Sequence, residues 1–253
     1  MTITPELIAF WLIAAVAAWV QTQAGFALGL ILMGAVGALG LMPVPQAAAV
    51  TSVLVVMHGV TVLLRGWRAA DLRVLAALLI GALPGIVVGY VLLSWLAGST
   101  VAGLQLLLGL VIAGSALQLA WRPGTIEQPT SPPVMTVTGF SGGILGGLFA
   151  TSGPPVIWQL YRQPMALHTV RTTLLAFFFV TQVFRLGVVI ASGGLTLPLL
   201  VTATGAAPAV LLGTWIARRF PPPVSPATIR KVALVLLFAS GASMVITGLT
   251  RLL

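Results

Sequence analysis

Charge and cysteine are what this sequence of 253 residues has least of. It contains no cysteine, which excludes disulfides and thiolate metal sites. Only 6% of the residues are charged, against about 25% in a soluble domain, while 59% are hydrophobic and the mean hydropathy is +1.14. The composition therefore predicts an integral membrane protein. Because the apolar stretches lack the alternation of outer-membrane strands, we expect an all-α polytopic bundle.

Acidic residues are especially scarce. The sequence has three carboxylates and twelve Lys and Arg residues. The carboxylates fall near the ends of apolar segments and are Glu6, Asp71 and Glu127. A cation transporter would need acidic ligands inside the membrane, so their absence there favours an anionic substrate. The arginines are scattered and form no solvated patch, which argues against nucleic-acid binding. The expected partners are a small anion and the lipid bilayer.

Ten apolar segments are predicted from hydropathy, turn signals and charge. No Lys or Arg precedes the first of them, so we expect no cleaved signal peptide. Six are expected to cross a hydrocarbon core about 30 Å thick, and the seventh in the series is far too short to do so. The segments are 6–24, 26–42, 46–64, 73–95, 101–120, 133–152, 154–162, 166–190, 197–217 and 229–251.

An internal repeat relates the two halves of the chain. The pattern GAxPxxxxG occurs at residues 81–89 and again at 205–213, and each copy is followed by a similar apolar segment. The two copies differ by a constant offset in residue number. When the same offset is applied to Gly25, the corresponding position in the second half lies close to Gly153. We therefore expect a first transmembrane repeat at 1–120, a cytoplasmic hinge at 121–132 and a second repeat at 133–253.

The basic segments fix the expected topology. The positive-inside rule assigns residues 65–73 and 218–231 to the cytoplasm. Counting crossings from them makes residues 133–165 begin and end on the inside, and residues 1–45 begin and end on the outside. Each half is then a re-entrant or broken-helix hairpin plus three transmembrane helices, so the halves are inverted, as in many transporters. We expect a multi-pass protein of the inner (plasma) membrane.

The stretch ATSGPP, residues 150–155, interrupts an apolar run. An unpaired backbone group in hydrocarbon costs several kcal/mol, so protein, water or ligand must satisfy such a break. Gly153 tolerates unusual backbone angles, Thr151 or Ser152 can cap the next helix, and the two prolines suit its first turn. The positive end of that helix would attract an anion by about 0.3 to 2 kcal/mol. Two opposed hairpins would aim two such ends at one point.

Side chains must complete this anion site, because Pro154 and Pro155 remove two backbone donors. The alternative is that small residues here only allow close helix packing. The candidate ligands are Thr22, Gln23, Gly25, Thr151, Ser152 and Gly153, with Gln21, Thr51, Ser52, Thr172 and Thr173 close by in the pattern.

Four further residues have two interpretations each. His58 could titrate and couple transport to protons, or be hydrogen-bonded inside the bundle, and the same holds for His168. Arg171 is either a functional intramembrane cation or a snorkelling side chain, and we expect Arg185 to snorkel. Aromatic residues near the breaks could clasp an aromatic substrate or serve as interface and lipid-facing residues. These aromatics are Trp19, Trp158 and Phe177 to Phe179.

The run GFSGGILGGLFATSGPP, residues 139–155, resembles the Gly-rich signature in the second half of the TauE/SafE family of sulfite-exporter-like membrane proteins. Residues 21–29 and 43–52 are similar in layout to its first half but lack its consecutive glycines. The resemblance covers nearly the whole chain and implies transport of small sulfur-containing anions such as sulfite, sulfoacetate or organosulfonates, without a cofactor. With Trp158 just after the break, the chain looks most like the toluenesulfonate-permease-type members.

The sequence thus predicts an inner-membrane transporter of a sulfur-containing anion, an aromatic sulfonate or sulfite, that works by alternating access at the two breaks. An anion channel, which would need a continuous polar lining, and a transporter of a non-sulfur organic anion are the alternatives. A membrane enzyme is disfavoured, because the chain has no HExxH, no cysteine and no carboxylate near either histidine. The sequence TSGPP also lacks the GxSxG nucleophile pattern.

Overall fold

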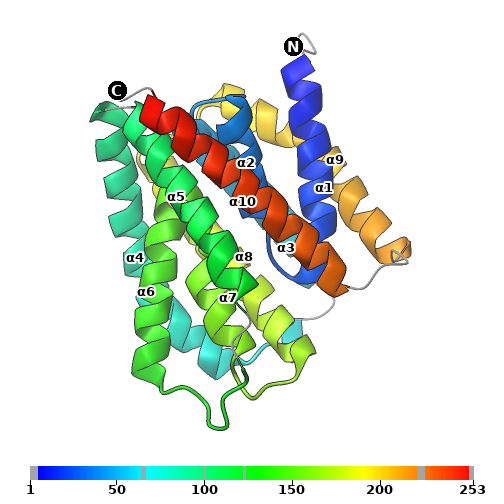
Figure 1. Cartoon of the computed structure of the whole chain (residues 1–253). Helices are drawn as coiled ribbons and strands as arrows, with labels where there is room; N and C mark the ends of the chain where they lie inside the picture. Colours follow the sequence, from blue (N-terminus) through cyan, green and yellow to red (C-terminus); the bar gives the residue numbers. More distant parts are fainter. Residues whose placement is uncertain (1–4, 64–66, 100, 122–123, 221–225, 251–253) are drawn as a thin grey trace.

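The protein is an all-helical bundle, seen in a computed structural model that describes residues 5–63, 67–99, 101–121, 124–220 and 226–250 (Figure 1). No strand occurs in these ranges, which confirms the predicted fold class. The helices follow the predicted apolar segments to within a few residues. They are α1 (Pro5–Ala24), α2 (Leu28–Leu39), α3 (Val44–Leu63), the 3-10 helix η1 (Trp67–Ala69), α4 (Leu72–Ser99), α5 (Val101–Ala120), α6 (Pro132–Phe149), α7 (Gly153–Tyr161), α8 (Leu167–Ala191), α9 (Leu197–Arg219) and α10 (Pro226–Thr250).

Seven of the described helices are long and apolar enough to cross a membrane: α1, α3, α4, α5, α8, α9 and α10. The sequence analysis counted six segments as long enough to cross, one fewer than these seven. The additional helix is α1, which the prediction treated only as one arm of a hairpin. With 20 residues it is about 30 Å long, the thickness of the hydrocarbon core. By contrast α7, with 9 residues, is far too short to cross.

Two helical hairpins, α1 with α2 and α6 with α7, enter the bundle from opposite ends (Figure 1). In that view α1 descends from the N-terminus at the top, whereas α6 rises from the loop at the bottom. Hydrogen bonds hold the beginning of the second hairpin beside its end, with Ile126 N donating to Arg162 O at 2.9 Å and Thr130 N donating to Gln163 Oε1 at 2.9 Å. This hairpin therefore starts and finishes at one end of the molecule.

Close helix pairs build the rest of the bundle: α4 packs with α6, α1 with α9, α5 with α10, and α3 with α8. Glycine makes the closest approaches possible. A Cβ on Gly85 would overlap the carbonyl oxygen of Phe140, and a Cβ on Gly143 would overlap that of Ala82. Small residues let helix backbones meet in a membrane, where lipid removes the hydrophobic drive for association. Gly213 of α9 lies in the same way against the carbonyl oxygen of Ala15 in α1.

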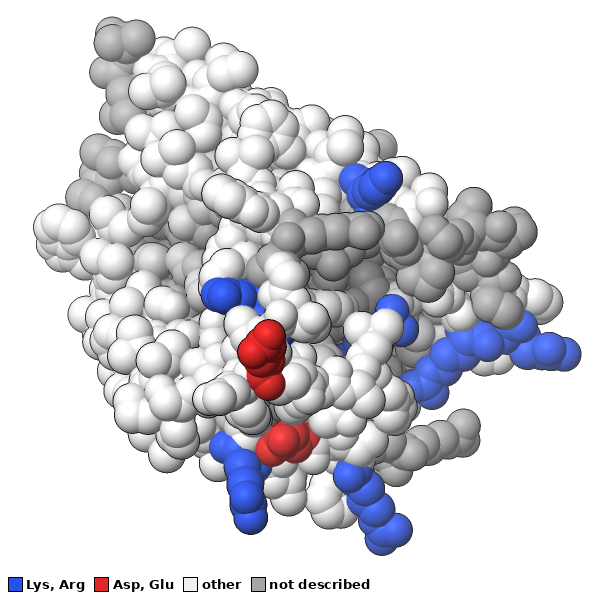
Figure 2. All heavy atoms as spheres, turned by 60° about the horizontal axis from the view of Figure 1, so that its bottom comes forward, with Lys and Arg blue, Asp and Glu red and all other residues white. Residues whose placement is uncertain are grey.

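Basic side chains mark one end of the molecule. Figure 2 shows Lys and Arg spread over the end that lies at the bottom of Figure 1, with acidic side chains among them. Segments at this end include η1, the loop before α6 and the loop after α7. The positive-inside rule assigns this end to the cytoplasm.

Candidate functional site

The two helix breaks meet in the interior of the bundle. Gly25, at the end of α1, and Ala150, at the end of α6, both have positive φ angles, +81° and +55°. Gly29 in the first turn of α2 lies against the second break, because a Cβ placed on it would be 2.9 Å from the carbonyl oxygen of Ala150 and 3.7 Å from Cβ of Thr151. Polar main chain from both hairpins is thus brought together.

Backbone strain accompanies the breaks. Ala27 has φ +108° and Ala150 has φ +55°, values that a residue with a Cβ rarely adopts. Such residues cost about 1 to 3 kcal/mol each and persist only where the surroundings hold them, commonly at ligand sites. Gln21 holds the first break, since its Oε1 accepts a hydrogen bond of 2.8 Å from the backbone N–H of Leu28 and so caps α2.

A small cavity of about 20 Å³ lies between the breaks. Its walls include Gln21, Ala27 and Gly29 from the first hairpin and Thr151, Ser152 and Gly153 from the second. This volume holds about one water molecule. The side chain of Ser152 is 1% exposed and its Oγ has no hydrogen-bond partner. The small volume and the buried residues around it indicate a conformation without room for an oxyanion.

The three candidates of the second break, Thr151, Ser152 and Gly153, all line this cavity. Gly25 of the first break does not line it, because it packs against Arg171, whose Cγ would be 3.2 Å from a Cβ on Gly25. Gly29, which the sequence analysis did not single out, takes the place beside the cavity. Arg171 is half-buried, and its Nε is buried without a hydrogen-bond partner.

The polar residues just before the first break form hydrogen bonds to α3 and to α9. Gln21 Nε2 donates to His58 Nδ1 at 3.2 Å, so the neutral ring carries its proton on Nε2, which lies 3.1 Å from Thr22 Oγ1. His58 is thus hydrogen-bonded inside the bundle. The amide of Gln23 donates to the carbonyl oxygen of Ala217 at 2.8 Å and is engaged in helix packing.

Thr51 and Ser52 of α3 lie behind the breaks. Cγ2 of Thr51 would be 3.7 Å from a Cβ on Gly29, and Thr51 is fully buried. Ser52 Oγ lies 2.8 Å from Gln182 Oε1, to which it donates. Gln182 lines the cavity and its Nε2 donates to the carbonyl oxygen of Ala150 at 3.0 Å, a carbonyl that the break frees. Ser52 therefore supports the second break through Gln182.

Arg185 does not snorkel, and that expectation was wrong. Its side chain is 1% exposed, and Nη1 donates to Ser52 Oγ at 2.7 Å and to the carbonyl oxygen of Ala48 at 3.0 Å. Nε donates to the carbonyl oxygen of Gly147 at 3.2 Å, while Nη2 has no partner. Position 185 faces α3 and α6 and not lipid, so these neutral oxygens hold the guanidinium in the interior.

Trp158 lies outside the residues that line the central cavity, so its predicted clasp on an aromatic substrate has no support there. Its ring is half-buried and faces the guanidinium of Arg162, whose Cζ is 4.3 Å from the ring centroid. Phe178 does line the cavity. Thr173 Oγ1 accepts a hydrogen bond of 2.9 Å from the backbone N–H of Asp71, away from the cavity.

Sequence reasoning underrated three polar residues: Gln21, Gln182 and Arg185. A signal for the last two was present, because an amide and a guanidinium in the predicted crossing 166–190 are costly in hydrocarbon and so mark a function or a partner. Their orientation could not be derived, since a helix that is apolar on all sides gives no amphipathic pattern.

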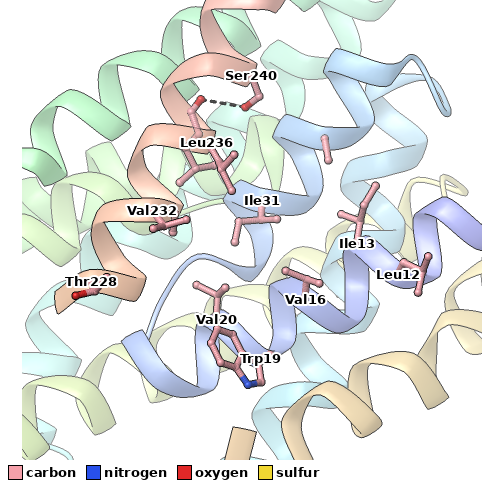
Figure 3. Close-up of a pocket in the computed structure, with 13 residues that line it drawn as sticks. Leu12, Ile13, Val16, Trp19, Val20, Ile31, Thr228, Val232, Leu236 and Ser240 are labelled. Carbon is pink, nitrogen blue, oxygen red and sulfur yellow. Dashed lines mark hydrogen bonds between the residues drawn. The ribbon is translucent and has the colours of Figure 1, made fainter. Parts of the chain in front are cut away.

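A groove of about 600 Å³, much larger than the central cavity, lies elsewhere, between α1, α2 and α10 (Figure 3). Its walls are almost entirely apolar, with Trp19, Val16 and Leu236 among them. The hydroxyl of Ser240 in this groove donates to the carbonyl oxygen of Leu237 at 2.9 Å. The groove suits lipid chains and not an oxyanion, which needs hydrogen-bond donors.

Comparison with known proteins gives two kinds of match. The sequence pattern of the family described as "Sulfite exporter TauE/SafE" matches residues 10–244. A protein of Cupriavidus necator named "Probable sulfite/organosulfonate exporter TauE" is 41% identical over 230 residues, which are 91% of this chain and 90% of that protein. "Probable inner membrane transporter protein TsaS" of Comamonas testosteroni is 32% identical over 172 residues, 64% of this chain and 69% of that protein. No solved structure matches.

Proposed function

Because this chain belongs to the sulfite exporter TauE/SafE family, we propose that it carries a sulfur oxyanion, sulfite or an organosulfonate, across the membrane. The family consists of membrane transporters and not of enzymes, and the chain is a multi-pass protein of the inner membrane. Two features of the molecule support an anionic cargo. The helix breaks supply polar main chain, and the described residues that line the central cavity include no carboxylate.

The substrate site is the central cavity, with the oxyanion between Gly29 of the first hairpin and Thr151, Ser152 and Gly153 of the second. The observation that carries this proposal is the hydroxyl of Ser152, a residue that lines the cavity: the side chain is 1% exposed, and its Oγ lies beside Gly146 of α6 without a hydrogen-bond partner. An unsatisfied buried polar group costs about 1 to 3 kcal/mol. A bound oxyanion would accept its hydrogen bond and remove that cost.

Transport then proceeds by alternating exposure of this site. The two hairpins enter from opposite ends, so movement of one would open the site to one side while the other keeps it closed. The closed cavity of about 20 Å³ corresponds to a conformation without access for the anion. It favours a transporter over a channel, because a channel would need a continuous polar lining.

Transport assays in proteoliposomes test this function. We expect saturable movement of sulfite or of an organosulfonate, with a thermal-shift screen of sulfite, thiosulfate, sulfoacetate and 4-toluenesulfonate to rank the substrates. Ser152→Ala should weaken substrate binding about tenfold, and Thr151→Ala with Ser152→Ala more strongly, because donors to a charged ligand contribute about 1.5 to 3 kcal/mol.

Ser141→Ala is the matched control, since Ser141 is exposed on α6 and donates to the carbonyl oxygen of Thr138 at 2.9 Å. It should leave binding unchanged. If the wild-type protein neither binds nor moves any of the four anions, the proposed function is wrong. If it binds them and the double variant binds equally well, the transporter stands but the site between the breaks does not. Unsaturable anion current would indicate a channel.

A further inference from the structure

A second polar cavity, of about 110 Å³, lies at the end of the bundle where α3 begins and where α4 and α8 end. Its polar walls are Gln46, Tyr90, Ser94 and Arg185, and the other residues that line it are apolar or small. The loop at 191–196 and the junction at 96–100 are expected outside the membrane on the side opposite to the basic end. The cavity is therefore a vestibule on the outer side.

Arg185 gives this vestibule an unbalanced positive charge. Arg185 lines the vestibule, its side chain is 1% exposed, and its Nη2 has no hydrogen-bond partner. The three bonds of Nε and Nη1 go to neutral oxygens, and no described residue that lines the vestibule is acidic. Tyr90 faces the same space, and its hydroxyl is bonded to Ser192 Oγ at 2.5 Å. A buried charge without a counter-charge is costly, and an anion would offset that cost.

We propose that the vestibule is a second anion site, in which Arg185 binds a compact sulfur oxyanion on its way to or from the centre. This inference rests on the proposed function and adds a residue to it. The volume of about 110 Å³ is several times that of one water molecule, so an oxyanion of sulfite size fits.

A single layer of hydrogen-bonded side chains separates the vestibule from the central cavity. Arg185 Nη1 donates to Ser52 Oγ at 2.7 Å, and Ser52 Oγ lies 2.8 Å from Gln182 Oε1. Gln182 lines the central cavity, whereas Arg185 lines the vestibule. An anion that draws the guanidinium toward the vestibule would pull on Ser52 and, through it, on the support of the second break. Ser52 and Gln182 therefore act as positioning residues.

Calorimetric titration of the purified protein with sulfite tests the proposal. Arg185→Gln should weaken sulfite binding about 10- to 100-fold, because a hydrogen bond to a charged group contributes a free energy of this size to binding. Arg185→Lys keeps the positive charge and should restore part of the binding. Gln46→Glu tests the same site without touching the three bonds of Arg185. It keeps the shape of the side chain and adds a negative charge to the wall of the same cavity, so sulfite should bind about tenfold more weakly.

Gln128→Glu provides the matched control, since Gln128 is exposed in the hinge and the change of charge is identical. It should bind sulfite as the wild type does. If Gln46→Glu also binds sulfite normally, the vestibule site is overturned, whether or not Arg185→Gln folds. A wild-type protein that binds none of the tested oxyanions would overturn the proposed function instead. Loss of binding in Ser152→Ala alone would leave the transporter with only its central site.

Discussion

Ser152 carries a hydroxyl that no protein group uses, although the side chain is 1% exposed. Because the unpaired hydroxyl contributes nothing to the closed protein, Ser152→Ala should leave the thermal unfolding temperature unchanged or raise it. The same variant should lose most of the stabilisation that sulfite gives the wild type. Thermal unfolding in detergent with and without sulfite measures both effects. A drop of several degrees without ligand would show that the hydroxyl is structural.

Gln21 differs from Ser152, because both the oxygen and the nitrogen of its side-chain amide make hydrogen bonds. Its Oε1 caps α2 at Leu28 N and its Nε2 donates to His58 Nδ1. Gln21→Ala should therefore destabilise the protein by about 1 to 3 kcal/mol, visible as a lower unfolding temperature. Gln128→Ala at an exposed position should change little. Equal unfolding temperatures for the two variants would contradict the capping role.

At the scale of single residues the sequence predicted the part of the central cavity that the second break forms. Thr151, Ser152 and Gly153 line this cavity. They could be predicted because the backbone groups that a helix break leaves unpaired need polar surroundings. Gly25 proved less informative than Gly29, since the turn at the first break carries Gly25 against Arg171 and brings Gly29 to the second break. Only the packing of distant helices decides which of two nearby glycines faces the cavity.

At the scale of elements, the close packing of helix pairs stabilises the bundle. Gly143→Ala should destabilise the protein, because the new Cβ would overlap the carbonyl oxygen of Ala82 and push α6 from α4. Overpacking of this kind costs about 1 to 3 kcal/mol. Gly187→Ala is the control, since no atom lies within 4 Å of its added Cβ and alanine is the better helix former. Detergent unfolding should separate the two variants, and a stable Gly143→Ala would contradict the close α4–α6 contact.

Helix bounds could be predicted well because glycine, proline and charge mark them. The predicted 154–162 became α7 (Gly153–Tyr161), and 197–217 became α9 (Leu197–Arg219). The number of helices long enough to span the membrane was predicted less accurately. The reason is α1, which has the length of a crossing helix but also forms one arm of a hairpin. Length and hydropathy measure whether a helix is able to cross, and they do not distinguish these two roles.

The relation between the two halves belongs to the whole molecule, and it stays a prediction. If α1 to α5 correspond to α6 to α10, the pair of α4 with α6 has its counterpart in the pair of α9 with α1. Both pairs occur, and the pairs of α5 with α10 and of α3 with α8 map onto themselves. This pattern is what an exchange of two inverted halves would produce.

Side-specific labelling tests the orientation of the molecule. The chain has no cysteine, so single-cysteine variants give a clean background. Ala97→Cys at the exposed rim of the vestibule should react with an impermeant maleimide from outside the cell. Gln128→Cys in the hinge should react only in inside-out vesicles, because the positive-inside rule predicts that the basic end faces the cytoplasm. Reaction of both from the same side would contradict a crossing by α5, which lies between the two positions, and with it the predicted topology.

The central claim is that two helix breaks hold an anion inside the bilayer, and locating a bound anion tests it most directly. Selenite, a heavier analogue of sulfite, would be bound to crystals of the protein and found by its anomalous scattering. We predict a peak between Gly29 and Ser152, with a weaker one at Arg185. Clear binding in solution combined with the absence of any peak between the two breaks would contradict the claim.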